Sequence, residues 1–154
     1  MPDFFDRAVA DDLLARIDRL TPETEPQWGK MNVAQMLAHC SKPFEAVYDE
    51  EYLRQNPKPN AVLRFVLRVL AKSAVVGDKP YKRNGSTAPS FIVADERDFE
   101  AERARLKAFI EQAHGESAAA YDGRESHSFG VLSAREWSTL FHKHTDHHLT
   151  QFGV

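Results

Sequence analysis

Ser133 to Gln151, SAREWSTLFHKHTDHHLTQ, decides the fold, because it reads as one long amphipathic helix with four of the chain's seven histidines. Ser133 and Glu136 have the spacing of a capping box, in which each side chain bonds the other's backbone amide, so the helix should begin here. At 100° per residue, Trp137 and Phe141 lie on one apolar face. We expect that face to meet the protein core.

Two of the histidines fall in the middle of this apolar face. With Trp137 at 0°, His144 lies at about 340° and His148 at about 20°, one helical turn apart. Two imidazoles at this spacing lie one above the other, and burying both without partners is costly. Either a divalent metal binds them, or hydrogen bonds to backbone or carboxylate groups satisfy them in the core. A metal requires a third ligand from elsewhere in the chain.

The other side of this helix reads as polar. His142 falls there with Ser138, Lys143 and Asp146, and we expect these side chains to point to water. His147 falls on the edge of the apolar face, where it is a candidate second-layer group with a structural or a catalytic role. Only His144 and His148 are therefore selected as ligands by helix geometry.

Length and composition describe an ordinary globular chain. The 154 residues fit one domain (1–154), and the net charge of −3 offers no basic field for nucleic acid. Cys40 is the one cysteine, which excludes an intrachain disulfide and suits a reducing cytoplasm. The N-terminus lacks the pattern of a signal peptide, and no apolar run reaches the roughly 20 residues of a membrane helix. We expect a cytoplasmic protein without membrane or nucleic-acid partners.

Helical periodicity dominates the remaining sequence, with no alternating strand pattern. We therefore expect an all-α fold, a four-helix bundle with one extra short helix or long loop. Asn32 and Gln35 form a second capping box, and Asp95 is a candidate cap further on. The expected helices span about 4–20, 32–48, 61–74, 96–113 and 133–151, with long loops at 77–90 and 115–127.

The helix at 32–48 contributes one further histidine. Cys40 lies at the centre of its apolar stripe and reads as an inert core thiol. His39 lies about 120° from that centre, so helix geometry alone makes it a flanking residue. Glu50 is expected on one face with His39 and is a candidate second-layer carboxylate with a structural or a catalytic role. His127, in the loop before the last helix, either lies at the surface or approaches the mouth of a metal site.

Two clusters of basic side chains can each be interpreted as solvent-facing or as anion-binding. Arg64, Arg68 and Lys72 form a row at i, i+4, i+8, which is either a solvated helix face or a contact for an anionic substrate group. The segment 77–90 is long for a loop in a compact domain, which is typical of a functional or mobile segment. Its basic side chains, Lys79, Lys82 and Arg83, either face water or recognise an anion.

Two longer motifs resemble a known family. WGKMNVAQMLAHC (28–40) looks like the second-helix motif of the DinB/YfiT-like superfamily of metalloenzymes, and HTDHHLTQFG (144–153) resembles its C-terminal motif. The segment at 87–91 and the ending DHHLxQFG are similar to those of an uncharacterised bacterial subfamily. The resemblance covers nearly the whole chain. In many relatives Arg-Gly-Gln follows the HxxHH segment, where this chain has Leu149-Thr150-Gln151, so any role of that arginine is lost.

The resemblance implies a four-helix bundle with a three-histidine metal site. Its ligands match His39 in the second helix and the HxxxH pair His144 and His148 in the last. Only the resemblance assigns His39 as a ligand, whereas helix geometry selects His144 and His148 independently of it.

Several functional expectations come with this family. They are a divalent ion, zinc or nickel first, a small-molecule substrate, hydrolase or thiol (S-)transferase chemistry with a low-molecular-weight thiol, and a homodimer. The alternative is a non-enzymatic helical module for binding or dimerisation, with a structural metal or none. Metal content and a substrate screen discriminate between the two classes.

Overall fold

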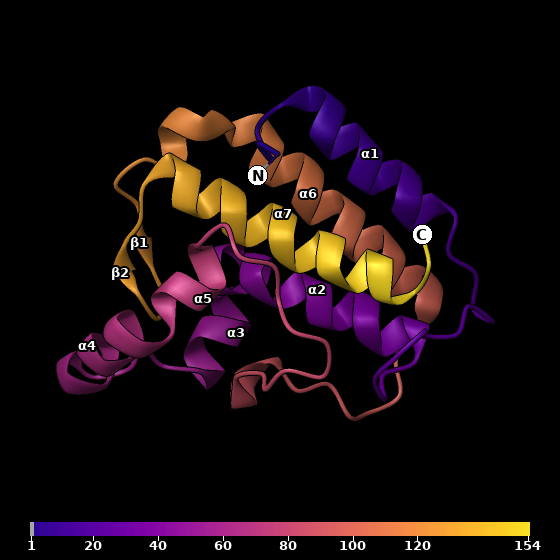
Figure 1. Cartoon of the computed structure of the whole chain (residues 1–154), viewed down its shortest axis with the longest axis horizontal. Helices are drawn as coiled ribbons and strands as arrows, with labels where there is room; N and C mark the ends of the chain where they lie inside the picture. The colour runs from indigo at the N-terminus through magenta and orange to yellow at the C-terminus, as the bar shows by residue number, and fades with distance from the viewer. Residues whose placement is uncertain (1) are drawn as a thin grey trace.

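A long helix, α7 (Ala134–Gln151), runs through the middle of the protein, as Figure 1 shows. The computed structural model describes residues 2–154. Ser133 caps α7, and both hydrogen bonds of the capping box with Glu136 are present, so this prediction is confirmed. The helix therefore begins where the sequence expected, and its histidines keep the predicted angular order.

Three further long helices pack with α7. They are α1 (Arg7–Asp18), α2 (Val33–Tyr48) and α6 (Phe99–Tyr121). The capping box of Asn32 and Gln35 begins α2, as predicted. Asp98 caps α6 in place of Asp95, and this helix continues past the expected end near residue 113. The expected loop at 115–127 is therefore wrong in its first half, although α6 is bent at Ser117, where φ is 66°.

Shorter elements complete the described chain, which is mostly helical and has seven α-helices between residues 2 and 154. The helix expected at 61–74 is divided at Ala71, so that two short helices stand in its place. A single antiparallel hairpin pairs Glu125 with Val131. These elements are α3 (Glu50–Gln55), α4 (Ala61–Leu70), α5 (Lys72–Val76), the 3-10 turn η1 (Pro89–Phe91), β1 (Glu125–Ser126) and β2 (Gly130–Val131).

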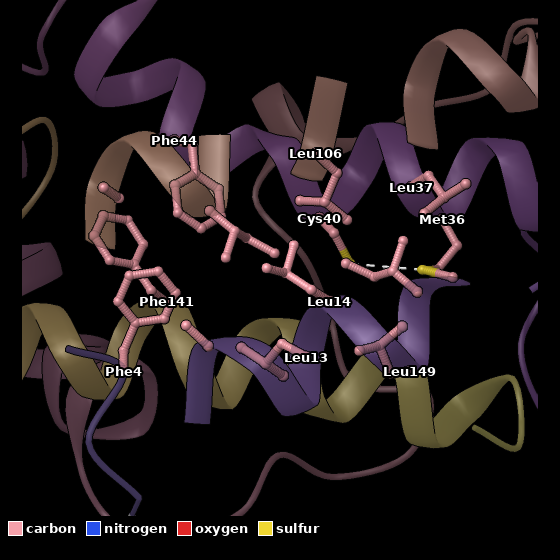
Figure 2. Packing of buried hydrophobic residues seen from close by; sticks show 14 of the residues in the cluster. Phe4, Leu13, Leu14, Met36, Leu37, Cys40, Phe44, Leu106, Phe141 and Leu149 are labelled. Carbon is pink, nitrogen blue, oxygen red and sulfur yellow. Dashed lines mark hydrogen bonds between the residues drawn. The ribbon is translucent and has the colours of Figure 1, made fainter. Parts of the chain in front are cut away.

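Aromatic and aliphatic side chains from the four long helices and the N-terminal segment form the core (Figure 2). Phe44 of α2 stacks on Phe141 of α7 with ring centroids 4.4 Å apart, and Phe4 lies 5.2 Å from Phe141. Full burial of each such side chain stabilises the fold by roughly 1.5–3 kcal/mol. Cys40 is buried among them, and burial raises the pKa of its thiol, which agrees with the expected inert core residue.

The prediction that one side of α7 faces water is wrong, because the protein covers the helix on that side too. Ser138, Lys143 and His142 are each less than 8% exposed. The backbone amide of Phe4 donates to Ser138 Oγ at 2.8 Å. The ammonium of Lys143 donates to backbone carbonyls within and beyond α5, those of Ala74, Gly77 and Lys79, at 2.6–3.1 Å. Structure on both sides therefore encloses α7. Ser138 and Lys143 are satisfied by backbone groups, whereas His142 Nδ1 is buried without a hydrogen-bond partner among residues 2–154.

Helix α4 turns its apolar face outward, and Figure 1 shows it projecting from the body. Arg64 faces the protein instead, and its guanidinium pairs with Glu125 at 2.5 Å. Lys72 of the basic row pairs with Glu136 at 2.7 Å, so the row is bound in part by the protein's own carboxylates. The exposed face consists of large apolar side chains that are 41–75% exposed, namely Val62, Leu63, Phe65, Val66, Val69 and Leu70. None of the helices within residues 2–154 is long and apolar enough to cross a membrane.

Candidate metal centre

The structure brings His39, His144 and His148 together between two helices. Phe44 stacks on Phe141 and His39 lies beside His144 and His148, so α2 and α7 run in opposite directions where they meet. His144 and His148 occupy successive turns of α7, as predicted. His39 is only 4% exposed and is therefore no flanking residue, because the segment that contains Phe91 folds over this side of α2.

The ring nitrogens of the three histidines converge. The Nε2 atoms of His39 and His144 are 3.1 Å apart, and one nitrogen from each of the three rings lies within 4.8 Å of the others. The centroid of the His148 ring is 4.5 Å from that of His39 and 4.9 Å from that of His144. Three imidazole nitrogens at these separations are compatible with one metal ion at their centre.

Hydrogen bonds orient two of these rings. His39 Nδ1 lies 2.8 Å from the carbonyl oxygen of Phe91, and His148 Nδ1 lies 2.7 Å from Gln151 Oε1. Because a carbonyl oxygen only accepts, each Nδ1 carries the proton and donates it. The Nε2 of each ring is then unprotonated, and its lone pair is directed at the cluster. This tautomer is the one that binds a metal.

Gln151 owes its position to a glycine. Its Nε2 donates to the carbonyl of Trp28 at 2.6 Å, which ties the end of α7 to the segment before α2. Gly29 has φ of +89°, and a Cβ there would stand 2.3 Å from Gln151 Nε2. Only glycine adopts this backbone conformation and allows this approach without strain. Sequence reasoning missed Gln151, although its spacing of three residues after His148 was a usable signal.

Burial keeps the three rings neutral. It lowers the pKa of His144 well below its ordinary value and that of His148 to about 3, and the neighbouring His39 adds to both shifts. Burial also lowers the pKa of His39, although the hydrogen bond to Phe91 opposes this. All three are neutral at pH 7, so no proton has to leave before a cation binds.

The donor set fits a divalent transition metal. If His39 and His148 present lone pairs, a proton on His144 Nε2 satisfies at most one of them, whereas a metal satisfies all three. His144 Nδ1 is also buried without a hydrogen-bond partner among residues 2–154. Three neutral imidazoles without a carboxylate suit zinc, nickel or iron rather than magnesium or calcium. The residues present therefore fit such an ion.

Aromatic side chains surround the cluster on its open side. The ring of His147 lies 5.9 Å from Trp28, 5.5 Å from Tyr81 and 5.0 Å from His148. The guanidinium of Arg83 covers the outer face of Trp28 at 4.2 Å. Burial raises the pKa of Tyr81, so this residue contributes a neutral phenol. Sequence reasoning identified His147 as a second-layer candidate and missed Trp28 and Tyr81.

A cavity of about 980 Å³ opens against the histidines. Residues of α2 and α7 line it, together with side chains from the segment 81–94 and from the turn of the hairpin. His127 lines this cavity, and its Nε2 lies 2.7 Å from the carbonyl oxygen of Asn56. The volume of the cavity is that of a small-molecule binding site. Part of the expected functional loop, including Lys82 and Ser90, therefore reaches the site.

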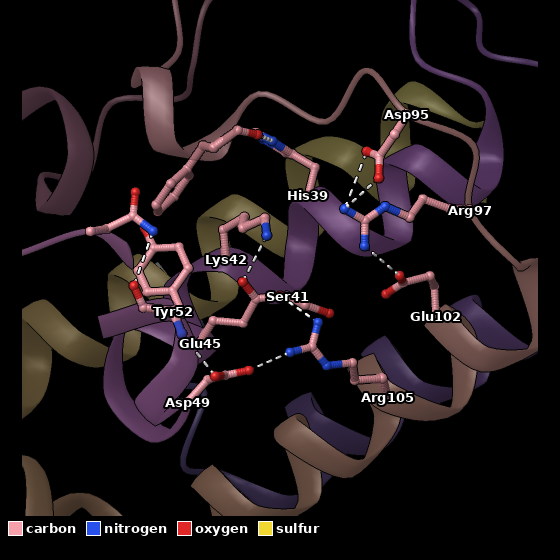
Figure 3. A network of polar contacts seen from close by, with 12 residues as sticks. His39, Ser41, Lys42, Glu45, Asp49, Tyr52, Asp95, Arg97, Glu102 and Arg105 are labelled. Carbon is pink, nitrogen blue, oxygen red and sulfur yellow. Dashed lines mark hydrogen bonds and ion pairs between the residues drawn. The ribbon is translucent and has the colours of Figure 1, made fainter. Parts of the chain in front are cut away.

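One predicted second-layer residue lies outside the site. Glu50 is exposed and begins α3, because α2 ends at Tyr48, so it shares no helix face with His39. The buried carboxylate near His39 is instead Glu45, on the next turns of α2 (Figure 3). It pairs with Lys42 at 2.7 Å and with Arg105 of α6 at 2.5 Å, which makes it a structural link between helices.

Comparison with known proteins gives one family. The sequence model of the family described as "Protein of unknown function (DUF1569)" matches residues 6–153. No curated protein and no solved structure matches the chain. The match spans all four long helices and all three clustered histidines, so the site belongs to the matched region.

Proposed function

Because the chain belongs to the DUF1569 family, whose description assigns no activity, we propose its function from the site: a divalent-metal-dependent enzyme of hydrolase or thiol (S-)transferase type. His39, His144 and His148 are the proposed ligands. The observation that carries the proposal is the convergence of their nitrogens at the wall of a cavity of small-molecule size. An ion placed there meets solvent and substrate on one side only.

The chain's own residues define what the site does. A divalent ion on three neutral imidazoles supplies a Lewis acid and lowers the pKa of a bound water or low-molecular-weight thiol. Phe91 and Gln151 hold two of the ligands in the binding tautomer. Trp28 and Tyr81 limit the access of bulk water. His147, half-buried beside the ligands, is the nearest further base that can accept a proton from substrate.

The proposed architecture is a four-helix bundle of DinB/YfiT type, formed by α1, α2, α6 and α7. It is supported by the mutual packing of these helices, with one ligand from the second long helix and an HxxxH pair from the last. A reducing cytoplasm suits the single buried thiol, Cys40. In this arrangement the chain between α2 and α6 is an insertion, and Tyr52 of α3, Val75 of α5 and the segment 81–94 are the parts of it that line the cavity.

A second candidate function is a binding or dimerisation module. One observation favours it, the outward apolar face of α4, since exposed patches of this kind often mark interfaces. The occupant that we propose is a second copy of the chain, giving a homodimer. Arg64 of the same helix is already bound to Glu125, whereas Arg68 is exposed beside Val69 and would lie at the edge of such an interface.

Metal analysis of protein purified without a histidine tag tests the enzyme proposal. We expect about one zinc or nickel ion per chain, and its loss in His144→Ala. His127→Gln is the matched control, because this histidine lines the same cavity outside the cluster and should leave metal content unchanged. Cobalt substitution then discriminates between the chemistries, since a thiol that joins the metal adds a charge-transfer absorption band. Metal-free protein after incubation with zinc, nickel and manganese would exclude the enzyme proposal.

A further inference from the structure

The cavity beside the histidines contains no acidic side chain. The chain has 23 Asp and Glu residues, yet none of them is among the described residues that line this cavity. Its charged lining residues are Lys30 and Lys82. Within residues 2–154 neither lysine makes an ion pair, whereas the neighbouring Asp95 pairs with Arg97. Both lysines are exposed, so they place positive charge at the rim of the cavity before any metal binds.

The lysines lie at the end of the cavity that holds the histidines. Lys30 follows Gly29, which approaches Gln151 at the C-terminal end of α7. Lys82 stands between Tyr81, which contacts His147, and Arg83, which covers Trp28. A divalent ion would add two positive charges at the same end. This end therefore attracts an anionic group and repels a cation.

The cavity continues along α7 toward apolar side chains. Trp137 and Gln151 both line it, and the 14 residue steps of helix from one to the other span about 21 Å. At the Trp137 end the lining includes Leu140, Val75 and Phe129, with Ser126, His127 and Ser128 of the hairpin beside them. Trp137 is satisfied by its own bond to the carbonyl of Arg124, so its ring presents only apolar surface to the cavity.

We propose that the substrate is an elongated anionic amphiphile, an apolar chain or ring system with a carboxylate or phosphate at one end. The anionic group lies between the histidines, Lys30 and Lys82, and the apolar body extends along α7 to Trp137. This inference rests on the proposed function in one respect: the end of the cavity that holds the histidines is taken as the place where the substrate reacts. The absence of acidic lining residues argues against cationic substrates, and the apolar far end argues against sugars and other fully polar ones.

Binding of matched twelve-carbon probes tests the proposal, with each probe below its micelle concentration. Calorimetry should show saturable binding of one dodecanoate or dodecyl phosphate per chain, at least tenfold tighter than dodecanol, for zinc-loaded protein. Dodecyltrimethylammonium and acetate should not bind, because one has the wrong charge and the other lacks the apolar body. Equal affinity for dodecanol, or binding of the cationic probe, would overturn the proposal.

Lysine variants locate the anionic group. Lys30→Gln with Lys82→Gln should weaken dodecanoate about tenfold and leave dodecanol unchanged, since each exposed charge contributes about two- to fivefold. Lys79→Gln is the control, because this exposed lysine belongs to the same loop but lies outside the cavity lining. An unchanged affinity in the double variant would also overturn the proposal. Repeating the series on metal-free protein separates the amphiphile proposal from the enzyme proposal. A preference for anionic over neutral probes that persists without metal supports the amphiphile proposal, even if metal analysis excludes the enzyme.

Discussion

Gln151 Oε1 accepts a hydrogen bond from His148 Nδ1 at 2.7 Å, while the amide nitrogen of the same side chain binds the carbonyl of Trp28 at 2.6 Å. One side chain thus links a candidate metal ligand to the segment that precedes α2. The two family-like motifs, WGK and HHLTQ, meet at this point. Their co-occurrence has a physical reason, since each holds the other's backbone or side chain in the geometry that the cluster needs.

Replacing Gln151 should weaken metal binding without removing a ligand. In Gln151→Leu, His148 loses its acceptor and the proton is free to move to Nε2, so we expect metal affinity to fall about 10- to 100-fold. Gln151→Glu keeps an acceptor and should retain affinity, provided that the protein folds without the bond to Trp28. Competition with a chromophoric chelator measures both variants. Equal affinities of wild type and Gln151→Leu would show that this bond does not orient His148.

Gly29→Ala should disturb the same junction through the backbone. Its φ of +89° and the 2.3 Å approach to Gln151 make any side chain strained, and we expect a loss of about 1–3 kcal/mol in unfolding free energy. Gly115→Ala is the matched control in α6, since a Cβ there meets nothing within 4 Å. It should be neutral or stabilise the protein by up to about 1 kcal/mol. Chemical denaturation compares the two, and equal effects would contradict the proposed role of Gly29.

The sequence predicts the parts of the site that depend on one helix. His144 and His148 share a face because helical periodicity is local, and the capping box at Ser133 fixes where that helix begins. His39 escaped the helix geometry, because its burial depends on the distant segment at Phe91 folding over α2. Resemblance to a family indicated His39 where periodicity did not.

The incorrect predictions concern features that depend on tertiary contacts rather than on one helix. His142 and Lys143 were expected in water, but α7 is covered on two sides, and one helix's pattern does not reveal how many neighbours enclose it. Asp95 and Asp98 are equally good caps on residue type, and only tertiary placement selects Asp98. The spacing of Gln151 from His148 is local, but the bond of Gln151 to the Trp28 carbonyl depends on tertiary placement that a local pattern does not reveal.

Metal should stabilise the folded protein in proportion to its occupancy. Because only the folded chain brings the three histidines together, zinc at about 100 times its dissociation constant should add about 2.7 kcal/mol to the unfolding free energy. Thermal unfolding with increasing zinc measures this as a rise in the midpoint. The rise should vanish in His144→Ala and persist in His127→Gln. A rise that persists in His144→Ala would place the stabilising ion elsewhere.

The junction between α4 and the hairpin should be sensitive to acid and salt. Lys58 and Arg64 hydrogen-bond the Glu125 carboxylate and lower its pKa from 4.5 to about 2. Because the folded-state pKa is depressed, the interaction is fully present above pH 4.5 and is lost as pH falls toward 2. Carbon-13 NMR of the carboxylate should show this midpoint at low salt. It should rise toward 4.5 in 1 M salt, or in Arg64→Gln, because the pair is exposed and screened. A midpoint near 4.5 in the wild type at low salt would show that α4 is not held by these bonds.

The outward face of α4 should contribute to association rather than to folding. Val69 and Leu70 are 59% and 74% exposed, so changing both to Glu should alter the unfolding free energy of the monomer by less than about 0.5 kcal/mol. Leu13→Ala is the contrast, since Leu13 is fully buried and its truncation should cost about 2–5 kcal/mol. Sedimentation velocity of the Glu variants completes the test. If the apolar face joins two copies, the wild type is dimeric and the double variant monomeric, because two carboxylates would be buried unpaired in the interface. A monomeric wild type, or a dimer that tolerates both glutamates, would remove α4 as the dimer contact.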